Sequence, residues 1–126
     1  MDMKIIENKK IFAFDGANEC VAEVEDGETL IFRTHDCFDN QLSEAGSTIG
    51  SLSWDCINPA TGPVYVKNAL PGDVLKVEIL EITLGKQGVM CALPDNGVLG
   101  SLVKEESVKR LKVENGKVHF NEKIVF

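Results

Sequence analysis

The sequence predicts a mainly β fold, either a β-sandwich or a barrel of short antiparallel strands with little helix. Four dipeptides that supply the positive φ angles of tight turns recur along the chain: Asp15-Gly16, Asp26-Gly27, Asn96-Gly97 and Asn115-Gly116. The segments between them alternate apolar and polar residues at the period of two that is typical of strands. Short strands separated by such turns indicate a sandwich or barrel. At 126 residues, we expect a single domain that comprises the whole of 1–126.

The longest predicted strand covers residues 74–84. Leu75, Val77 and Ile79 alternate with charged residues, and the alternation then changes phase at Leu80. A change of phase moves side chains to the opposite face of a sheet, so we expect a bulge or strong coiling of the strand near this point. A second strand is predicted over residues 87–93, closed by the turn at 94–97.

Two hairpins are predicted. Residues 113–118 place Asn115-Gly116 between two short strands, as a two-residue type I′ turn requires. Residues 20–33 place Asp26-Gly27 between two alternating runs in the same manner. The apolar residues 123–126 are predicted to pair as a terminal strand; the alternative is that the natural polypeptide continues beyond them.

Little of the sequence indicates helix. Residues 101–108 are compatible with one or two helical turns, for which Ser101 would be the cap. Residues 41–54 are small and polar, and we expect a long loop that is functional or mobile.

Charge and composition exclude several classes of protein. The net charge of −7 argues against nucleic acid or an anionic membrane surface as a partner. The basic residues at 109–112 are interpreted as a solvated strand edge. No apolar run approaches the ~20 residues of a membrane-spanning helix, and no secretory signal is visible at the start. We therefore expect a cytoplasmic protein whose four cysteines, none in a Cys-x-x-Cys pair, are reduced.

The strongest candidates for chemistry are His35 and Asp36, which directly follow a predicted strand. An imidazole beside a carboxylate can bind a metal or activate water. Consecutive strand residues point to opposite faces, so both can reach one site only if a turn begins at His35. A turn carboxylate beside a surface histidine is the alternative interpretation.

Other polar residues nearby are weaker candidates. Cys37 is a conceivable nucleophile, although no neighbouring base is evident and a buried inert thiol is the simpler interpretation. The carboxylates of Asp39, Glu44 and Asp55 are interpreted as solvated. In the loop 58–63, we expect Pro59 to restrict Asn58 to an extended backbone conformation. Gly62 in the same loop permits an unusual backbone angle. This loop could present an amide donor to a carbonyl oxygen, or serve only as a structural turn.

Three blocks of the sequence together resemble the acetamidase/formamidase family. They are residues 34–38 (THDCF), 58–66 (NPATGPVYV) and 69–79 (ALPGDVLKVEI), and the resemblance extends over about residues 10–100. It implies a β-rich fold, oligomers and hydrolysis of short-chain amides, of the formamide and acetamide type, to carboxylate and ammonia. It also implies a divalent metal ion, for which zinc is favoured.

Carried over to this sequence, the resemblance implies catalytic and metal-binding roles for Asp36 and His35. It implies that Asn58 and Gly62 shape the substrate pocket. Members of the family are roughly twice as long, so the resemblance covers the N-terminal half only. We expect either an amidase that acts as part of a homo-oligomer or larger enzyme, or a non-catalytic β-domain that serves in assembly or small-ligand binding.

Overall fold

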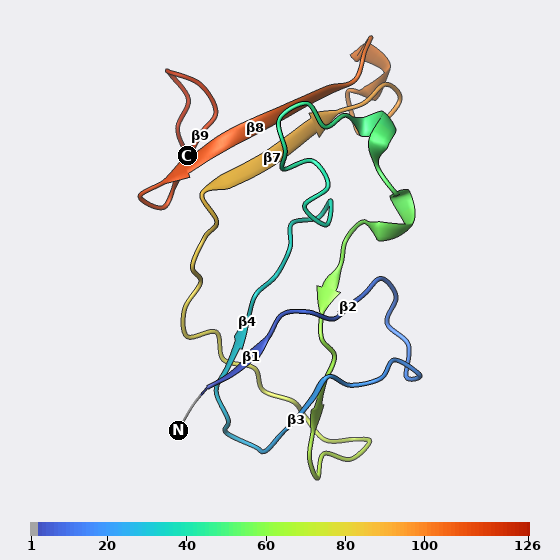
Figure 1. Ribbon diagram of the computed structural model, residues 1–126, viewed down its shortest axis with the longest axis vertical. Coiled ribbons are helices and arrows are strands. Elements are labelled where there is room, and N and C mark those ends of the chain that lie inside the picture. Colours follow the sequence, from blue (N-terminus) through green and yellow to red (C-terminus); the bar gives the residue numbers. More distant parts are fainter. Residues whose placement is uncertain (1–2) are drawn as a thin grey trace. The chain divides into compact units, whose positions relative to one another are not determined.

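The computed structural model describes residues 3–126, and strands dominate it (Figure 1). The prediction of a mainly β protein is confirmed, because helix is limited to three short 3₁₀ segments in the described part of the chain. The chain divides into two compact units. The first comprises the residues up to Asp39 together with Ser53–Glu78, and the second comprises Asn40–Leu52 together with Ile79–Phe126. Each unit is described by itself.

Among its described residues, the first unit contains six short strands and one 3₁₀ helix. They are β1 (Lys4–Ile6), β2 (Lys10–Ile11), β3 (Ala22–Val24), β4 (Leu30–Phe32), η2 (Trp54–Cys56), β5 (Ala60–Thr61) and β6 (Val64–Val66). Strands β2 and β5 pair antiparallel, whereas β1 pairs with β4 and β3 with β6 in parallel. Antiparallel pairing was expected throughout, and for these two pairs it is wrong. Parallel strands require a long crossover connection, which leaves no local turn signal in the sequence.

The hairpin predicted over residues 20–33 does not form. Its turn is present, since the N–H of Glu28 donates to the carbonyl of Glu25 at 3.3 Å and Gly27 has a φ of +81°. The strands on either side nevertheless pair with β6 and β1 rather than with each other. Pairing with β6 buries Val24, which is 6% exposed. A tight turn therefore fixed the reversal of the chain but not the partners of the strands.

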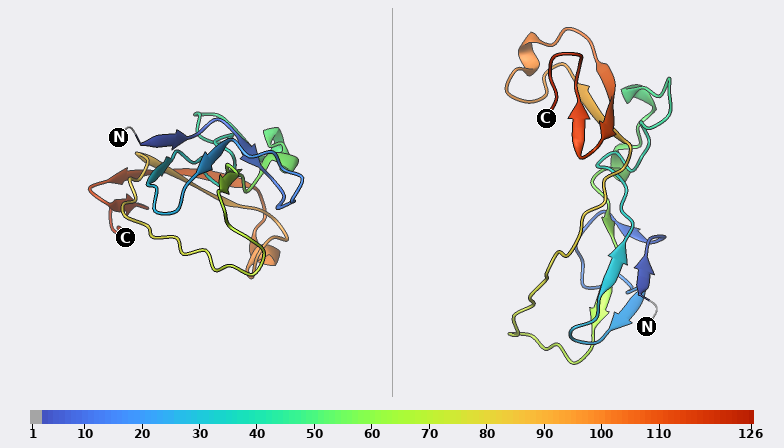
Figure 2. Two further views of the ribbon diagram at one scale, coloured as in Figure 1. Left: turned by 90° about the horizontal axis from the view of Figure 1, so that it is seen from below. Right: turned by 90° about the vertical axis from the view of Figure 1, so that its left-hand side faces the viewer.

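The second unit is built on a three-stranded antiparallel sheet, seen from two sides in Figure 2. Its elements are η1 (Ile49–Ser51), β7 (Gln87–Ala92), η3 (Gly100–Leu102), β8 (Ser107–Glu114) and β9 (Lys117–His119). The strand predicted at 87–93 is confirmed as β7. The hairpin predicted at 113–118 is confirmed as β8 and β9. Asn115 and Gly116 both have positive φ, +53° and +71°, as a type I′ turn requires.

One expectation for this unit is confirmed in part, and another is wrong. The segment 101–108 begins with one helical turn, the 3₁₀ helix η3, but the cap of this turn is Leu99 rather than Ser101, and β8 begins at Ser107. The basic tract 109–112 lies in β8, which is the central strand of the sheet rather than an edge. Its alternation is as expected, with Leu111 buried and Lys112 exposed.

The loop expected at 41–54 is anchored to the sheet by Arg110. The guanidinium donates from Nε to the carbonyl of Leu42 at 2.9 Å and from its terminal nitrogen to the carbonyl of Ser47 at 3.1 Å. Leu42 is fully buried. The loop therefore supplies core as well as connection, and the small set of buried apolar residues comprises Ile6, Val24, Leu42, Ile49, Leu52 and Leu111.

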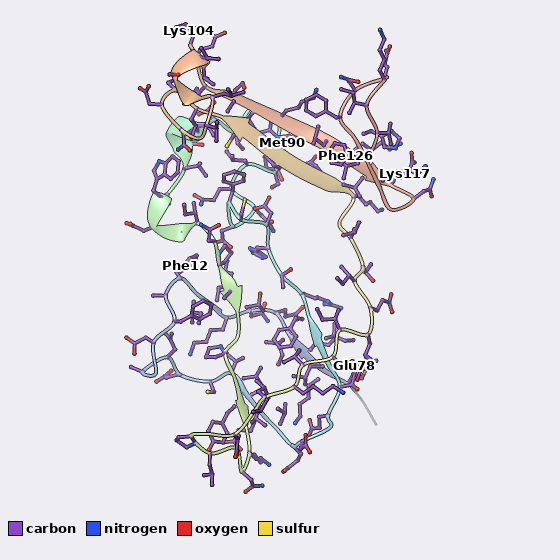
Figure 3. All side chains as sticks on the ribbon, turned by 180° about the vertical axis from the view of Figure 1, so that it is seen from behind. Phe12, Glu78, Met90, Lys104, Lys117 and Phe126 are labelled. Atoms are coloured by element: carbon purple, nitrogen blue, oxygen red, sulfur yellow. The ribbon has the colours of Figure 1, made fainter. Side chains whose placement is uncertain are left out.

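The longest predicted strand, residues 74–84, is not a strand in the structure. Its backbone has no ladder partner among residues 3–126, and the trace carries no arrow in Figure 1. The side chains on it are largely in solvent, from Val74 at 94% exposed to Leu84 at 57%. Glu78, labelled in Figure 3, lies in this segment. The alternation of the sequence indicates a strand, but a strand also needs a neighbouring strand for its backbone hydrogen bonds.

The C-terminal residues pair with β9, as expected. Val125 forms an antiparallel bridge with His119, and Phe126 and Val118 exchange two backbone hydrogen bonds of 2.6 and 3.1 Å. Phe126 is labelled close to Lys117 of β9 in Figure 3. Among the described residues, none of the helices has the length and apolar character to cross a membrane.

Candidate active site

The predicted residues His35 and Asp36 lie where the chain leaves β4. The strand ends at Phe32, and a turn follows in which the N–H of Asp39 donates to the carbonyl of Asp36 at 2.9 Å. The carboxylate of Asp36 also accepts the N–H of Phe38 at 3.0 Å. Because strand geometry stops before His35, the objection that consecutive residues face opposite sides of a sheet does not apply here.

The turn brings His35 against Asp39. Its Nδ1 lies 2.7 Å from Oδ1 of Asp39. From β2, the ammonium of Lys10 lies 2.7 and 2.9 Å from the two oxygens of the same carboxylate. The side chains of Asp39 and Lys10 are only 15% and 24% exposed, whereas that of His35 is 37% exposed. We refer to these three residues as the Lys10–Asp39–His35 cluster.

The cluster fixes which nitrogen of His35 carries a proton. The hydrogen bond from Lys10, with a smaller contribution from His35, holds the pKa of Asp39 below its ordinary value of 3.8. Asp39 is therefore ionised at neutral pH and accepts hydrogen bonds from both neighbours. Nδ1 of His35 must then carry the hydrogen, so the contact of 3.3 Å between Lys10 and Nδ1 joins two donors. In a neutral imidazole that carries its hydrogen on Nδ1, the lone pair lies on Nε2, where it can accept a proton.

Backbone hydrogen bonds join the loop 58–63 to the cluster. Lys10 is in register with Thr61 in the β2–β5 pair, and the N–H of Gly62 donates to the carbonyl of Lys9 at 2.9 Å. The N–H of Asn58 donates to the carbonyl of Cys37 at 2.7 Å. The structure thus places the predicted substrate-binding loop beside the turn that carries His35 and Asp36.

The conformation of this loop differs in part from the prediction. Gly62 adopts a φ of +121° before a cis peptide bond to Pro63, as its freedom from a Cβ permits. Asn58 was expected to be extended, but its φ is +54°, a left-handed conformation that asparagine adopts more readily than most residues other than glycine. The N–H groups of Asn58 and Gly62 both serve in backbone hydrogen bonds, so the exposed Asn58 carboxamide is the donor that this loop can present.

The described part of the first unit carries a small hollow and a larger one. The smaller has a volume of about 50 Å³, above the roughly 10–15 Å³ that a cavity needs to hold one water molecule. Asn58 and Ala60 line it together with the apolar residues 11–14. The larger, about 480 Å³, is an open hollow beside β1 and β3 whose lining includes none of the predicted site residues. The smaller hollow is thus the one that shares a residue with the predicted site.

Sequence reasoning found His35 but not its two partners. Asp39 was interpreted as a solvated carboxylate, although its spacing of four residues from His35 was a weak signal. Lys10 precedes His35 by 25 residues in the chain, and only the pairing of β2 with β5 brings it to the cluster. Cys37 is exposed rather than buried, so the expectation of a buried thiol is wrong; it lies in the turn between Asp36 and Asp39, and its carbonyl accepts the N–H of Asn58.

The donor set does not complete a metal site. Within residues 3–126, no three His, Cys, Asp or Glu side chains lie together in the way that a protein-bound zinc ion requires. The ammonium of Lys10 beside His35 and Asp39 also disfavours a second cation at that position. A zinc ion at His35 and Asp36 would therefore need further ligands from outside the described residues.

Comparison with known proteins identifies the class. The sequence profile of the Acetamidase/Formamidase family matches residues 14–122. The fold is similar to the crystal structure of an acetamidase from Bacillus halodurans, with 37% identity and a TM-score of 0.91. It is equally similar to a predicted acetamidase/formamidase from Thermoanaerobacter tengcongensis, with 38% identity and a TM-score of 0.90. No curated protein sequence matches the chain.

The chain belongs to the acetamidase/formamidase family, which confirms the resemblance drawn from its three sequence blocks. These structures match 97% and 98% of this chain, but only 42% of each relative's chain. The chain therefore spans less than half the length of the relatives it matches.

Proposed function

We propose that this chain supplies part of the active site of an amidase that hydrolyses short-chain amides to a carboxylate and ammonia. The observation that carries the proposal is the pairing of His35 with the ionised Asp39 in a chain of this family. A carboxylate that holds Nδ1–H leaves Nε2 as a base, which is the arrangement that water activation needs.

In the proposed reaction, Nε2 of His35 takes a proton from a water molecule while the oxygen of that water attacks the amide carbon. Asp39 stabilises the imidazolium that forms, as the partner of its Nδ1–H. The tetrahedral intermediate then expels the nitrogen, which takes the proton from His35 and leaves as ammonia. We assign Asp36 to orienting the water, and the Asn58 carboxamide to holding the carbonyl oxygen in a pocket shaped by Gly62.

A second candidate function is a non-catalytic β-domain that acts in assembly. The exposed apolar segment 74–84 and the coverage of 42% of the relatives favour it. The two candidates differ in whether His35 matters to turnover once the remainder of the fold is supplied.

The test is ammonia release from formamide and acetamide, with and without added zinc. The chain is assayed alone and together with a polypeptide that carries the remainder of the Bacillus halodurans acetamidase. We expect turnover in the mixture, and a loss of about 10²–10⁴-fold in His35→Gln, the range of a general base. The matched control is His119→Gln, which alters the second histidine of the chain, on β9, and should leave the rate unchanged.

Two results would contradict the amidase proposal. A folded mixture without turnover would favour the assembly domain, and so would turnover that His35→Gln leaves intact. If activity depends on zinc, the ligands that complete its site must come from the added polypeptide, since the described residues do not provide them.

A further inference from the structure

We propose that residues 74–84 are a strand that pairs with the remainder of the acetamidase fold. The alternation in its sequence predicts an extended strand, but the segment pairs with no other strand in the structure. The partner we assign is the polypeptide corresponding to the part of the solved acetamidase chains that this chain does not cover. Strand addition of this kind joins backbones by hydrogen bonds and uses alternating side chains for specificity.

The backbone of the segment has room for a partner. Regular backbone hydrogen bonds reach Asp73, whose N–H donates to the carbonyl of Leu70, and resume at Lys86, whose carbonyl accepts the N–H of Val113. Between them, residues 74–84 have neither ladder nor turn bonds in the described structure. An extended backbone with unpaired donors and acceptors is a template for a further strand.

The side chains of the segment are also largely exposed to solvent. Seven large apolar residues are at least 57% exposed: Val74, Leu75, Val77, Ile79, Leu80, Ile82 and Leu84. Soluble proteins seldom leave a contiguous apolar run of this extent in water, and such runs usually mark an interface. The alternation across Leu75, Val77 and Ile79 matches the spacing at which a paired strand presents side chains to one face.

The total accessible surface of the chain indicates how much area the proposed partner would cover. The chain has a mass of 13.8 kDa and exposes 10140 Å². Two separate globules of half that mass would together expose roughly 8,000 Å². The chain therefore exposes about 2,000 Å² more than two such globules would. A surface of that size corresponds to an obligate interface.

The comparisons with known proteins and the net charge of the chain indicate which polypeptide pairs with residues 74–84. This chain aligns with 42% of each solved acetamidase, so the larger part of the fold is available to cover the excess surface. A second copy of this chain is the less favourable partner, because each copy carries a net charge of −7 and like charges oppose association.

Hydrogen exchange tests the proposal without any measurement of activity. In the chain alone, the amides of residues 74–84 should exchange as unprotected amides at both low and high chain concentration. On addition of the remainder of the Bacillus halodurans acetamidase, their exchange should slow by about 100-fold or more, as for a paired strand. Protection in the dilute chain alone, protection that grows with its concentration, or no protection in the mixture would each overturn the proposal.

Two variants distinguish strand pairing from non-specific hydrophobic association. Ile79→Pro removes a backbone donor, and Val77→Ser removes an apolar side chain; both should weaken the association at least tenfold. The matched control is Val98→Ser, which changes a fully exposed valine outside the segment and should leave the association unchanged. Because the segment is unpaired in the chain alone, all three variants should retain its melting temperature. Equal weakening by Val98→Ser would refute the assignment.

Discussion

Replacing Asp39 with asparagine tests whether the Lys10–Asp39–His35 cluster stabilises the fold. The substitution keeps the shape of the side chain but removes its charge. Asparagine offers one oxygen acceptor, and its NH₂ group is a donor that Lys10 and the Nδ1–H of His35 cannot use. One charge-assisted hydrogen bond is therefore lost, and the ammonium of Lys10, 24% exposed, keeps an incomplete set of partners.

The expected cost follows from the contacts. A hydrogen bond to a charged group contributes roughly 1.5–3 kcal/mol. The pair with Lys10 is largely shielded, whereas the 37% exposure of His35 reduces the value of its contact. We expect Asp39→Asn to lower the free energy of unfolding by about 2 kcal/mol and the melting temperature by roughly 10 °C.

Urea unfolding at neutral pH measures this change, with Asp15→Asn as control. Asp15 accepts the N–H of Ala17 at 2.8 Å at an exposed turn, a bond that asparagine can also accept, so its replacement should be nearly neutral. A double-mutant cycle with Lys10→Met isolates the contribution of the pair. A loss in Asp39→Asn no larger than that in Asp15→Asn would refute the reasoning.

The pH dependence provides an independent check. The folded pKa of Asp39 is lowered from 3.8, so its contribution is present above that pH and is lost as pH falls through the folded pKa. The stability difference between wild type and Asp39→Asn should therefore shrink as the pH falls below about 4. A difference that grows as the pH falls below about 4 would contradict the assigned direction.

Two further predictions concern the second unit. Gly116→Ala places a Cβ at a φ of +71° and should destabilise the chain by about 1–2 kcal/mol in thermal unfolding, whereas Gly16→Ala in the first unit, where φ lies outside the left-handed region, should cost much less. Equal effects would contradict the type I′ turn. Leu42→Ala empties a fully buried position and should cost about 2–5 kcal/mol in urea unfolding, against less than about 0.5 kcal/mol for the 69% exposed Leu102→Ala. A mild effect at Leu42 would show that the loop is not part of the core.

Local sequence signals were sufficient where the structure is local. Asn115-Gly116 specified a hairpin because both residues tolerate positive φ, and its strands are adjacent in the chain. The strand Gln87–Ala92 was predicted correctly, and its partner β8 is the next strand in the chain. The same logic failed at Asp26-Gly27, because the strands beside that turn have partners distant in sequence.

For the candidate site, the sequence by itself determined the family, through three separate blocks, and the position of His35 and Asp36 just after a strand. Only the tertiary structure decided that Asp39 and Lys10 are the contacts of His35, because the pairing of β2 with β5 brings Lys10 there from 25 residues away. It also decided that residues 74–84 stay unpaired. Alternation records a tendency to form a strand, but a strand forms only where a second backbone satisfies its hydrogen bonds.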